Sequence, residues 1–234
     1  MAPRRARVLA DAAEDRSLRE HLIEVTQRLF AESGFEQLTT RRIARAAGVA
    51  DGVLYNHFAN KDELILAALA ARWSELVAAF RDACPTAGSG TVEANLAQLA
   101  AAMLELQRAV LPLLVGLIGK RMLLRRFLAS LHTPEAGGPD TVLDCVHAYL
   151  ADEQRRGRLS AQGEAHVAGI FLFAIAQLQA VVTHFRAADT GTIEAARELQ
   201  PFVHFVAEAL TAGRVERRRQ TTRKGPERRR RTSP

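Results

Sequence analysis

The sequence contains few cysteines, few aromatic residues and no long run of uncharged apolar side chains. Its two cysteines, Cys84 and Cys145, fit neither the spacing of a zinc site nor a disulfide framework, so we expect a reducing, cytoplasmic setting. The longest uncharged apolar run, 109–119, is eleven residues long and contains Pro112. A bilayer span needs about 20 such residues, so we expect no membrane partner. The N-terminal arginines precede no apolar stretch, and we expect no signal peptide.

Signatures of catalysis are also missing. The chain has no glycine-rich phosphate loop, no nucleophile elbow and no paired-carboxylate pattern. Asp144 and His147 are three residues apart, but a helical metal site needs partner Glu and His sets that the sequence does not supply. We therefore expect no enzyme, no catalytic residues, no metal and no cofactor.

What is abundant points to helices. Apolar residues make up 48% of the chain and charged residues 25%, and Ala, Leu, Arg and Glu dominate while alternating Val/Ile runs are scarce. These are strong helix formers, so we predict an all-α fold. The net charge of +6 is unevenly spread: residues 214–234 contain ten Lys/Arg and two Glu, a local charge of +8, which leaves −2 for the rest.

The apolar spacing divides the chain into helices and loops. From Leu18, a first helix has Leu22, Val25, Leu29 and Phe30 on one face and ends near Glu32, with Ser33-Gly34 as its C-cap. Thr39 or Thr40 caps a second helix that stops at Gly48. A third runs over 51–58, and Asn60 caps a longer one. After a loop at 84–90, further helices are expected at 92–111, 113–131, 140–156, 163–187 and 192–213.

The second and third helices have the layout of a helix-turn-helix. Small residues at Ala44 and Ala47 allow the helices to approach closely, and Gly48 permits the turn between them. Ile43 and Leu54 contribute to a small core, which leaves the outer face of the third helix free to enter the major groove of DNA.

The segment GFEQLTTRRIARAAGVADGVLYNHFANKDELILAAL, within residues 18–69, resembles the N-terminal DNA-binding domain of the TetR/AcrR family of transcriptional regulators. The resemblance covers about a quarter of the chain. It implies a homodimer whose paired recognition helices read a palindromic operator in double-stranded DNA. It also implies a helical C-terminal domain that binds a small molecule. Carried over by position, the residues implied to face DNA are Thr40, Arg41, Gly52, Val53, Tyr55, Asn56 and Lys61.

Chemistry supports several of these assignments. Arg41 can form a bidentate contact with a guanine, Tyr55 and Lys61 can hold phosphates, and Gly52 allows the backbone to approach a phosphate closely. Two positions depart from the family pattern, which often has Ser or Thr where this chain has Ala50 and Val53. Ala50 cannot cap the recognition helix, so we expect Asp51 to cap it. We expect His57 to pack or to make a local hydrogen bond.

The rest of the chain suggests a ligand cavity and a dimer interface. Pro112 within an apolar helix predicts a bend that leaves room for a ligand, although a helix end in the core is an alternative. Candidate lining residues are Pro112, Tyr149, Phe171, Phe173 and Gln177. The segment 163–187 is apolar on nearly all sides, which suits a helix that also packs against a second copy. Candidate interface residues are Leu178, Val182, Phe202 and Phe205.

We therefore predict a disordered arm at 1–16, a helix-turn-helix DNA-binding domain at 17–62, a helical regulatory and dimerisation domain at 63–213, and a disordered arginine-rich tail at 214–234. The tail has three interpretations: salt-sensitive, non-specific DNA affinity, a solubilising extension, or a minor-groove arm.

The hypothesis is a cytoplasmic, nucleoid-associated bacterial repressor that is relieved by a small apolar or amphipathic effector. The alternatives are a broad-specificity or architectural DNA-binding protein that uses the basic tail, and a helical small-molecule-binding protein without a DNA role.

Overall fold

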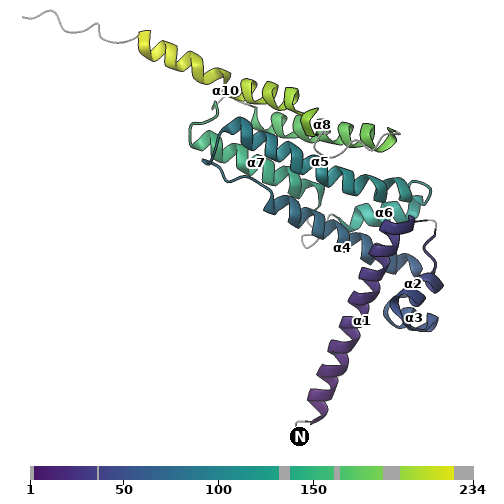
Figure 1. Ribbon diagram of the computed structural model, residues 1–234. Coiled ribbons are helices and arrows are strands. Elements are labelled where there is room, and N and C mark those ends of the chain that lie inside the picture. Colours follow the sequence, from purple (N-terminus) through teal and green to yellow (C-terminus); the bar gives the residue numbers. More distant parts are fainter. Residues whose placement is uncertain (1–2, 36, 132–137, 161–163, 187–195, 224–234) are drawn as a thin grey trace, which may run out of the picture. The chain divides into compact units, whose positions relative to one another are not determined.

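The computed structural model describes residues 3–35, 37–131, 138–160, 164–186 and 196–223. Every regular element in these ranges is a helix (Figure 1), which confirms the predicted all-α class. The helices are α1 (Pro3–Ser33), α2 (Thr40–Ala47), the 3₁₀ helix η1 (Asp51–Val53), α3 (Leu54–His57), α4 (Lys61–Asp82), α5 (Val92–Leu117), α6 (Arg121–Ser130), α7 (Pro139–Arg155), α8 (Ala165–Phe185) and α10 (Gln200–Arg223).

The chain forms two compact units. The first comprises Met1–Ala78 and Ala109–Pro139, and the second comprises Ala79–Arg108 and Asp140–Pro234. The predicted domain boundary at residues 62 and 63 does not coincide with a boundary between these units. The first unit contains, besides α1 to α3, most of α4, the end of α5 and all of α6.

The core of the first unit begins with the inner face of α1. Leu22, Val25 and Leu29 are buried, as their spacing predicts. α1 ends at Ser33, and Gly34 has a positive φ of 71° while its N–H donates to the carbonyl of Phe30 at 2.9 Å. This left-handed C-cap releases the chain toward α2, which packs beside α1 (Figure 1).

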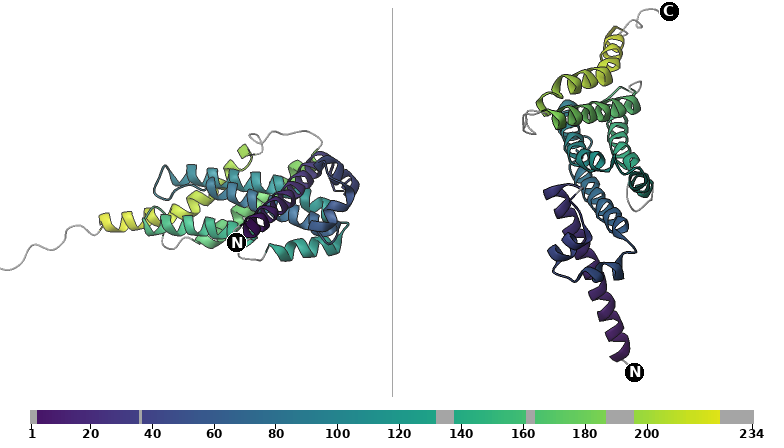
Figure 2. Two further views of the ribbon diagram at one scale, coloured as in Figure 1. Left: turned by 90° about the horizontal axis from the view of Figure 1, so that it is seen from below. Right: turned by 90° about the vertical axis from the view of Figure 1, so that its right-hand side faces the viewer.

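The prediction of a disordered arm at residues 1–16 is wrong for residues 3–16, which belong to α1. The N-terminal part of α1 projects beyond the other helices of the first unit (Figure 2). This segment is rich in Ala and Arg, and extending an existing helix avoids the cost of nucleating a new one. A contact of 3.3 Å between Asp15 Oδ1 and His57 Nδ1 also attaches this part of α1 to α3.

The predicted break at Pro112 is also wrong, because α5 continues through it to Leu117. Proline removes one i→i−4 hydrogen bond from the helix. Apolar side chains on both sides of Pro112 are nevertheless buried, among them Val110, Leu111 and Leu113. Their burial offsets the loss of one hydrogen bond, and the chain leaves the helix only after Leu117, before α6 begins at Arg121.

In the second unit, α10 lies along α8 (Figure 2). The ring of Phe171 on α8 lies 6.4 Å from that of Phe202 and 6.2 Å from that of Phe205, both on α10. The tail predicted to be disordered from residue 214 is helical to Arg223, consistent with the high helix propensity of arginine. Residues 224–234 lie outside the described residues.

Among the described helices, two are long and apolar enough to cross a membrane by length and composition alone. These are α5, with half of its most apolar window buried, and α8, with 28% of that window buried. The burial of α5 is that of a core helix. α8 keeps large apolar side chains at the surface, and Val167, Ile170 and Leu178 are 57%, 44% and 59% exposed.

A buried ion pair fixes the loop between α4 and α5 in the second unit. Glu153 is fully buried and lies 2.9 Å from the Nε atom of Arg158, and it accepts a hydrogen bond from the N–H of Gly88 at 3.0 Å. Arg158 donates in turn to the carbonyls of Ser89 and Gly90. The carboxylate on α7 therefore holds both a guanidinium and the backbone of the loop.

We predict that Glu153→Ala destabilises the protein by roughly 3–5 kcal/mol, because it leaves the guanidinium of Arg158 without its buried partner. Urea denaturation followed by circular dichroism measures this loss. The neighbouring pair Asp152–Arg155 is partly exposed, so Asp152→Ala serves as the matched control and should change stability by about 1 kcal/mol or less. Equal effects of the two substitutions would contradict the assigned role of Glu153.

Candidate nucleic-acid interface

The geometry of α2 follows from its two caps. The side chain of Thr39 accepts a hydrogen bond from the N–H of Arg42 at 3.2 Å, so Thr39 is the N-cap. At the other end, Gly48 has a φ of 72°, and the N–H of Val49 donates to the carbonyl of Ala44 at 3.0 Å. These contacts fix the turn that leads to η1 and α3.

The predicted third helix at 51–58 is shorter and less regular than expected. One 3₁₀ turn, η1, passes into the single turn of α3, which ends at His57. Leu54 and Phe58 are each 2% exposed, and on α2 Ile43 and Ala44 are fully buried. These side chains set the angle between the two short helices, as the helix-turn-helix interpretation requires.

The opposite side of η1 and α3 is exposed. Tyr55 is 57% exposed, and Asn56 and Gly52 are also exposed. A Cβ atom added to Gly52 would have no atom within 4 Å, so the fold itself does not require glycine there. Val53 is half-buried, as are Thr40 at the start of α2 and Lys61 at the start of α4.

Asp51 does not cap the helix over 51–58 as predicted. The N-cap position is Ala50, which makes no side-chain capping hydrogen bond. The carboxylate of Asp51 instead lies 3.7 Å from the Nε atom of Arg41, whose side chain is 88% exposed. An acidic residue on this face therefore partly balances the charge of the arginine predicted to read a base.

His57 agrees with its predicted local role. Its side chain is 5% exposed and its Nδ1 atom lies 3.3 Å from the carboxylate of Asp15. Phe58 is covered on one side by the guanidinium of Arg19, whose carbon atom lies 4.9 Å from the ring centroid. The rings of His57 and Phe58 are thus both contacted by α1, whereas Tyr55 is exposed.

The start of α4 carries a second capping arrangement. Asn60 Oδ1 accepts a hydrogen bond from the N–H of Glu63 at 3.0 Å, which confirms Asn60 as the N-cap. The carboxylate of Glu63 reaches back to the N–H of Ala59 at 2.7 Å. Lys61 is the first residue of this 22-residue helix, where backbone N–H groups favour anions.

Sequence reasoning missed a cation that lies close to Lys61. Partial burial lowers the pKa of the Lys61 ammonium, and the charge of Lys120 lowers it further, while Asp62 acts in the opposite direction. Lys120 precedes α6, and its ammonium lies 4.4 Å from the centroid of the Phe35 ring. Two lysines 59 positions apart in sequence therefore add positive charge to the same region of the first unit.

The run KRMLLRR at 120–126 could have signalled this feature. Lys120, Arg121, Arg125 and Arg126 are all exposed, and no acidic residue occurs between 109 and 131. The sequence alone gave no indication that these four residues belong to the same compact unit as the helix-turn-helix.

The five residues predicted to line a ligand cavity are divided between the two units. Pro112 belongs to the first unit and lines a pocket there. Tyr149, Phe171, Phe173 and Gln177 belong to the second unit and are absent from the lining of that pocket. Tyr149 is 5% exposed, and burial raises the pKa of its hydroxyl to about 12.

Comparison with known proteins connects the helix-turn-helix to a family. Residues 22–68 match the family described as "Bacterial regulatory proteins, tetR family". The HTH-type transcriptional repressor KstR2 of Mycobacterium tuberculosis is 39% identical over 71 residues, which are 30% of this chain and 36% of that protein. The HTH-type transcriptional repressor AcnR of Corynebacterium glutamicum is 40% identical over 62 residues, 25% of this chain and 33% of that protein. The chain thus spans about a third of the length of these curated relatives.

Solved structures extend the likeness of fold beyond that segment. A crystal structure of a TetR-family regulator from Mesorhizobium loti has a TM-score of 0.64 at 17% identity and covers 82% of this chain and 96% of its own. A TetR regulator from Haloarcula marismortui has a TM-score of 0.62 at 19% identity, and the match covers 83% of this chain and 98% of that structure's chain. At these identities the likeness concerns the fold.

We predict that Lys120→Gln raises the pKa of Lys61, because the substitution removes a neighbouring positive charge. The rise should be incomplete, since the larger effect of burial remains. Titration of the lysine side chains by NMR measures it. Arg125→Gln, which removes one positive charge from α6, is the matched control and should leave the pKa of Lys61 unchanged. An unchanged pKa in Lys120→Gln would show that the two ammonium groups do not interact.

Proposed function

We propose that this chain, whose residues 22–68 match the family described as "Bacterial regulatory proteins, tetR family", is a DNA-binding transcriptional regulator of that family. The observation that carries the proposal is the exposed face of η1 and α3, where Gly52, Tyr55 and Asn56 are free of the core. A buried set of side chains holds this face on a short helix of the kind that enters a major groove.

The contacts are proposed to divide into base reading and phosphate binding. Arg41 is the base reader, because a guanidinium is suited to the paired acceptors of guanine. Tyr55, Thr40 and Asn56 have hydrogen-bond donors for phosphate oxygens, and Lys61 adds a positive charge at a helix N-terminus. Val53 is placed to contact a thymine methyl group.

We also propose that the protein is a repressor that binds a palindromic operator as a homodimer in the cytoplasm. The relatives KstR2 and AcnR are named as transcriptional repressors, which favours repression over activation. A small apolar or amphipathic effector would relieve repression by stabilising a conformer with lower affinity for DNA. Such an effector must bind the two conformers with different affinities, because equal binding shifts no equilibrium.

The proposed dimer interface is the exposed apolar face of the second unit. Leu178 is 59% exposed, and Phe202 and Phe205 are 40% and 63% exposed, while Val182 is half-buried. No charged residue occurs in α8, between Ala165 and Phe185. Apolar side chains at this density favour contact with a second copy, since water-exposed patches of this kind commonly mark interfaces.

The proposal is tested by selecting random duplex DNA at physiological salt with the intact chain and with Arg41→Ala. We expect a palindrome from the intact chain. Arg41→Ala should lose roughly 1–3 kcal/mol of discrimination at one base pair in each half-site. A third variant, with all ten Lys/Arg of 214–234 changed to Gln, should weaken binding and reduce its salt dependence but select the same palindrome. Sequence-blind binding that disappears in this third variant would support the architectural alternative.

Gly52→Ala distinguishes an effect on DNA affinity from an effect on the stability of the fold. The added methyl group meets no atom of the protein, so the melting temperature should be unchanged or slightly higher. The same methyl group would obstruct a phosphate that approaches the backbone, so affinity for the selected operator should fall about tenfold, roughly 1.4 kcal/mol. Unchanged affinity would remove Gly52 from the proposed contact surface.

We predict that the double substitution Leu178→Glu and Phe205→Glu converts the dimer into monomers, because each places a charge on the exposed apolar face. Sedimentation velocity gives the mass. Glu substitutions at Ala148 and Ala129, which are exposed on α7 and α6, provide the control and should leave the dimer intact. A dimer mass in both proteins would exclude this face as the interface.

A further inference from the structure

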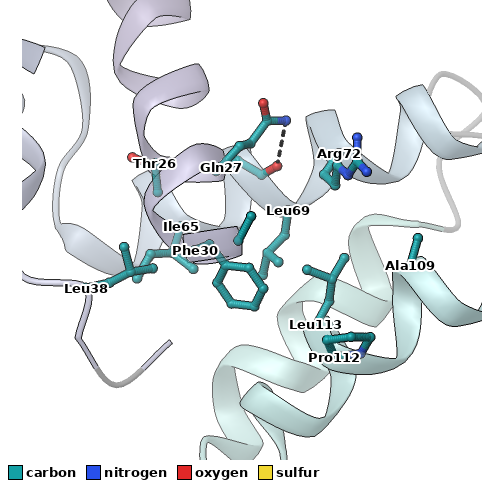
Figure 3. A pocket seen from close by; sticks show the side chains of 12 residues that line it. Thr26, Gln27, Phe30, Leu38, Ile65, Leu69, Arg72, Ala109, Pro112 and Leu113 are labelled. Carbon is teal, nitrogen blue, oxygen red and sulfur yellow. Dashed lines mark hydrogen bonds between the residues drawn. The ribbon is translucent and has the colours of Figure 1, made fainter. Parts of the chain in front are cut away.

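The first unit contains a pocket of about 260 Å³ that is built from three helices of that unit and from Leu38, which precedes α2 (Figure 3). α1 contributes Phe30, α4 contributes Leu69 and Arg72, and α5 contributes Pro112 and Leu113. All of its lining residues lie within Met1–Ala78 and Ala109–Pro139. The pocket therefore lies inside the same compact unit as the helix-turn-helix.

We propose that this pocket binds an uncharged, mainly apolar molecule with a single hydrogen-bond acceptor, and that its occupation directly changes the packing of the helix-turn-helix. The inference rests on the proposed function in one respect, since its consequence is a change in operator affinity. Of the residues predicted to line a ligand cavity, the proposed effector site includes only Pro112.

The walls of the pocket specify an apolar occupant. The rings and alkyl groups of Phe30, Leu69 and Leu113 face the space in Figure 3, and Pro112 closes one side. Sites of a few hundred Å³ with apolar walls and few polar groups are typical of small-molecule binding. The burial of the occupant would therefore supply most of its affinity.

The polar edge of the pocket selects a neutral acceptor over an anion. Arg72 Nη1 donates to Glu75 Oε2 at 3.0 Å, and the amide nitrogen of Gln27 lies 3.3 Å from the other carboxylate oxygen. The same amide nitrogen donates to the carbonyl of Ala68 at 3.2 Å. The positive charge of Arg72 is thus already balanced, and a ligand carboxylate would meet the negative charge of Glu75. The five N–H groups of the guanidinium still exceed the one bond to Glu75, so a neutral carbonyl or ether oxygen can be accommodated.

The same walls hold the helix-turn-helix together. Leu38 and Ile65 line the pocket, and each is 1% exposed. Leu38 directly precedes Thr39, the N-cap of α2, and Ile65 lies on the first turns of α4 after Lys61. A molecule in contact with these two side chains acts on the core beneath the proposed DNA-binding face, without any relay through the second unit.

α5 is suited to transmit such a change. Pro112 removes one hydrogen bond from the turn that lines the pocket, which makes that turn easier to bend. One turn further, a Cβ atom on Gly116 would lie 3.3 Å from Phe35 Cβ and 3.7 Å from Phe30 Cζ. Helix α5 therefore packs closely against the end of α1, and an occupant between Leu113 and Phe30 would press on the same contact.

The test uses two isosteric probes, 2-acetylnaphthalene and 2-naphthoic acid, with the full-length protein. Energy transfer from Trp73, the only tryptophan and the neighbour of Arg72, reports binding, and methyl NMR of Leu69 and Leu113 locates it. We expect the ketone to bind at least tenfold more tightly than the carboxylate. Arg72→Met should weaken the ketone about tenfold, because its acceptor loses the donor.

Ala109→Phe, which fills the pocket, should abolish binding, whereas Ala129→Phe on the exposed face of α6 should not. The ketone should also weaken binding to the selected operator, and it should have no such effect in Ala109→Phe. Equal binding of the two probes, methyl shifts elsewhere, or ketone binding by Ala109→Phe would each overturn the inference.

The outcomes separate this inference from the proposed function. An operator bound by a protein that does not bind the ketone would leave the function standing and remove the pocket as the effector site. If the ketone binds in the pocket but the protein selects no DNA sequence, the proposed function is contradicted while the ligand site remains. The regulatory part of the inference is then overturned as well.

Discussion

The orientation of the recognition helix depends on a small apolar core in the first unit. η1 and α3 together contain seven residues, too few to form a stable helix in isolation. Their position is set by the burial of Leu54 and Phe58 and by the packing of α2 on α1. The pocket is lined by Leu38 and Ile65 of the same core, so stability, the proposed DNA recognition and the proposed regulation depend on one set of side chains.

The sequence allowed much of this local structure to be predicted because the relevant signals are short-range. Thr39, Gly48 and Asn60 mark helix ends through hydrogen bonds and backbone angles that involve residues only a few positions away. The buried face of α1 follows from a regular spacing. The exposure of Tyr55 beside buried Leu54 follows from the same argument. Such features need no knowledge of the tertiary fold.

The failed predictions concern competition between local and tertiary effects. Pro112 locally favours a break, but buried neighbours on both sides keep α5 continuous. The charged ends of the chain locally suggest disorder, but each extends a helix that is already formed. Lys120 near Lys61, and Glu153 beneath the loop at Gly88, are pairings across 59 and 65 positions. Cys84 and Cys145 likewise interact, and burial, more than Cys145, raises the pKa of the Cys84 thiol to about 11. No pattern in a single sequence specifies such pairs.

The ion pair between Arg41 and Asp51 has a consequence for how the protein would find its site in a genome. Every stretch of duplex presents phosphates, and a carboxylate near them is repelled everywhere along the DNA. In the proposed complex, a guanine in the correct place would let Arg41 exchange the carboxylate for two acceptors, whereas an incorrect base would not. Asp51 would therefore shorten the residence time on wrong sequences more than on the right one, so that the search proceeds faster at the cost of some total affinity.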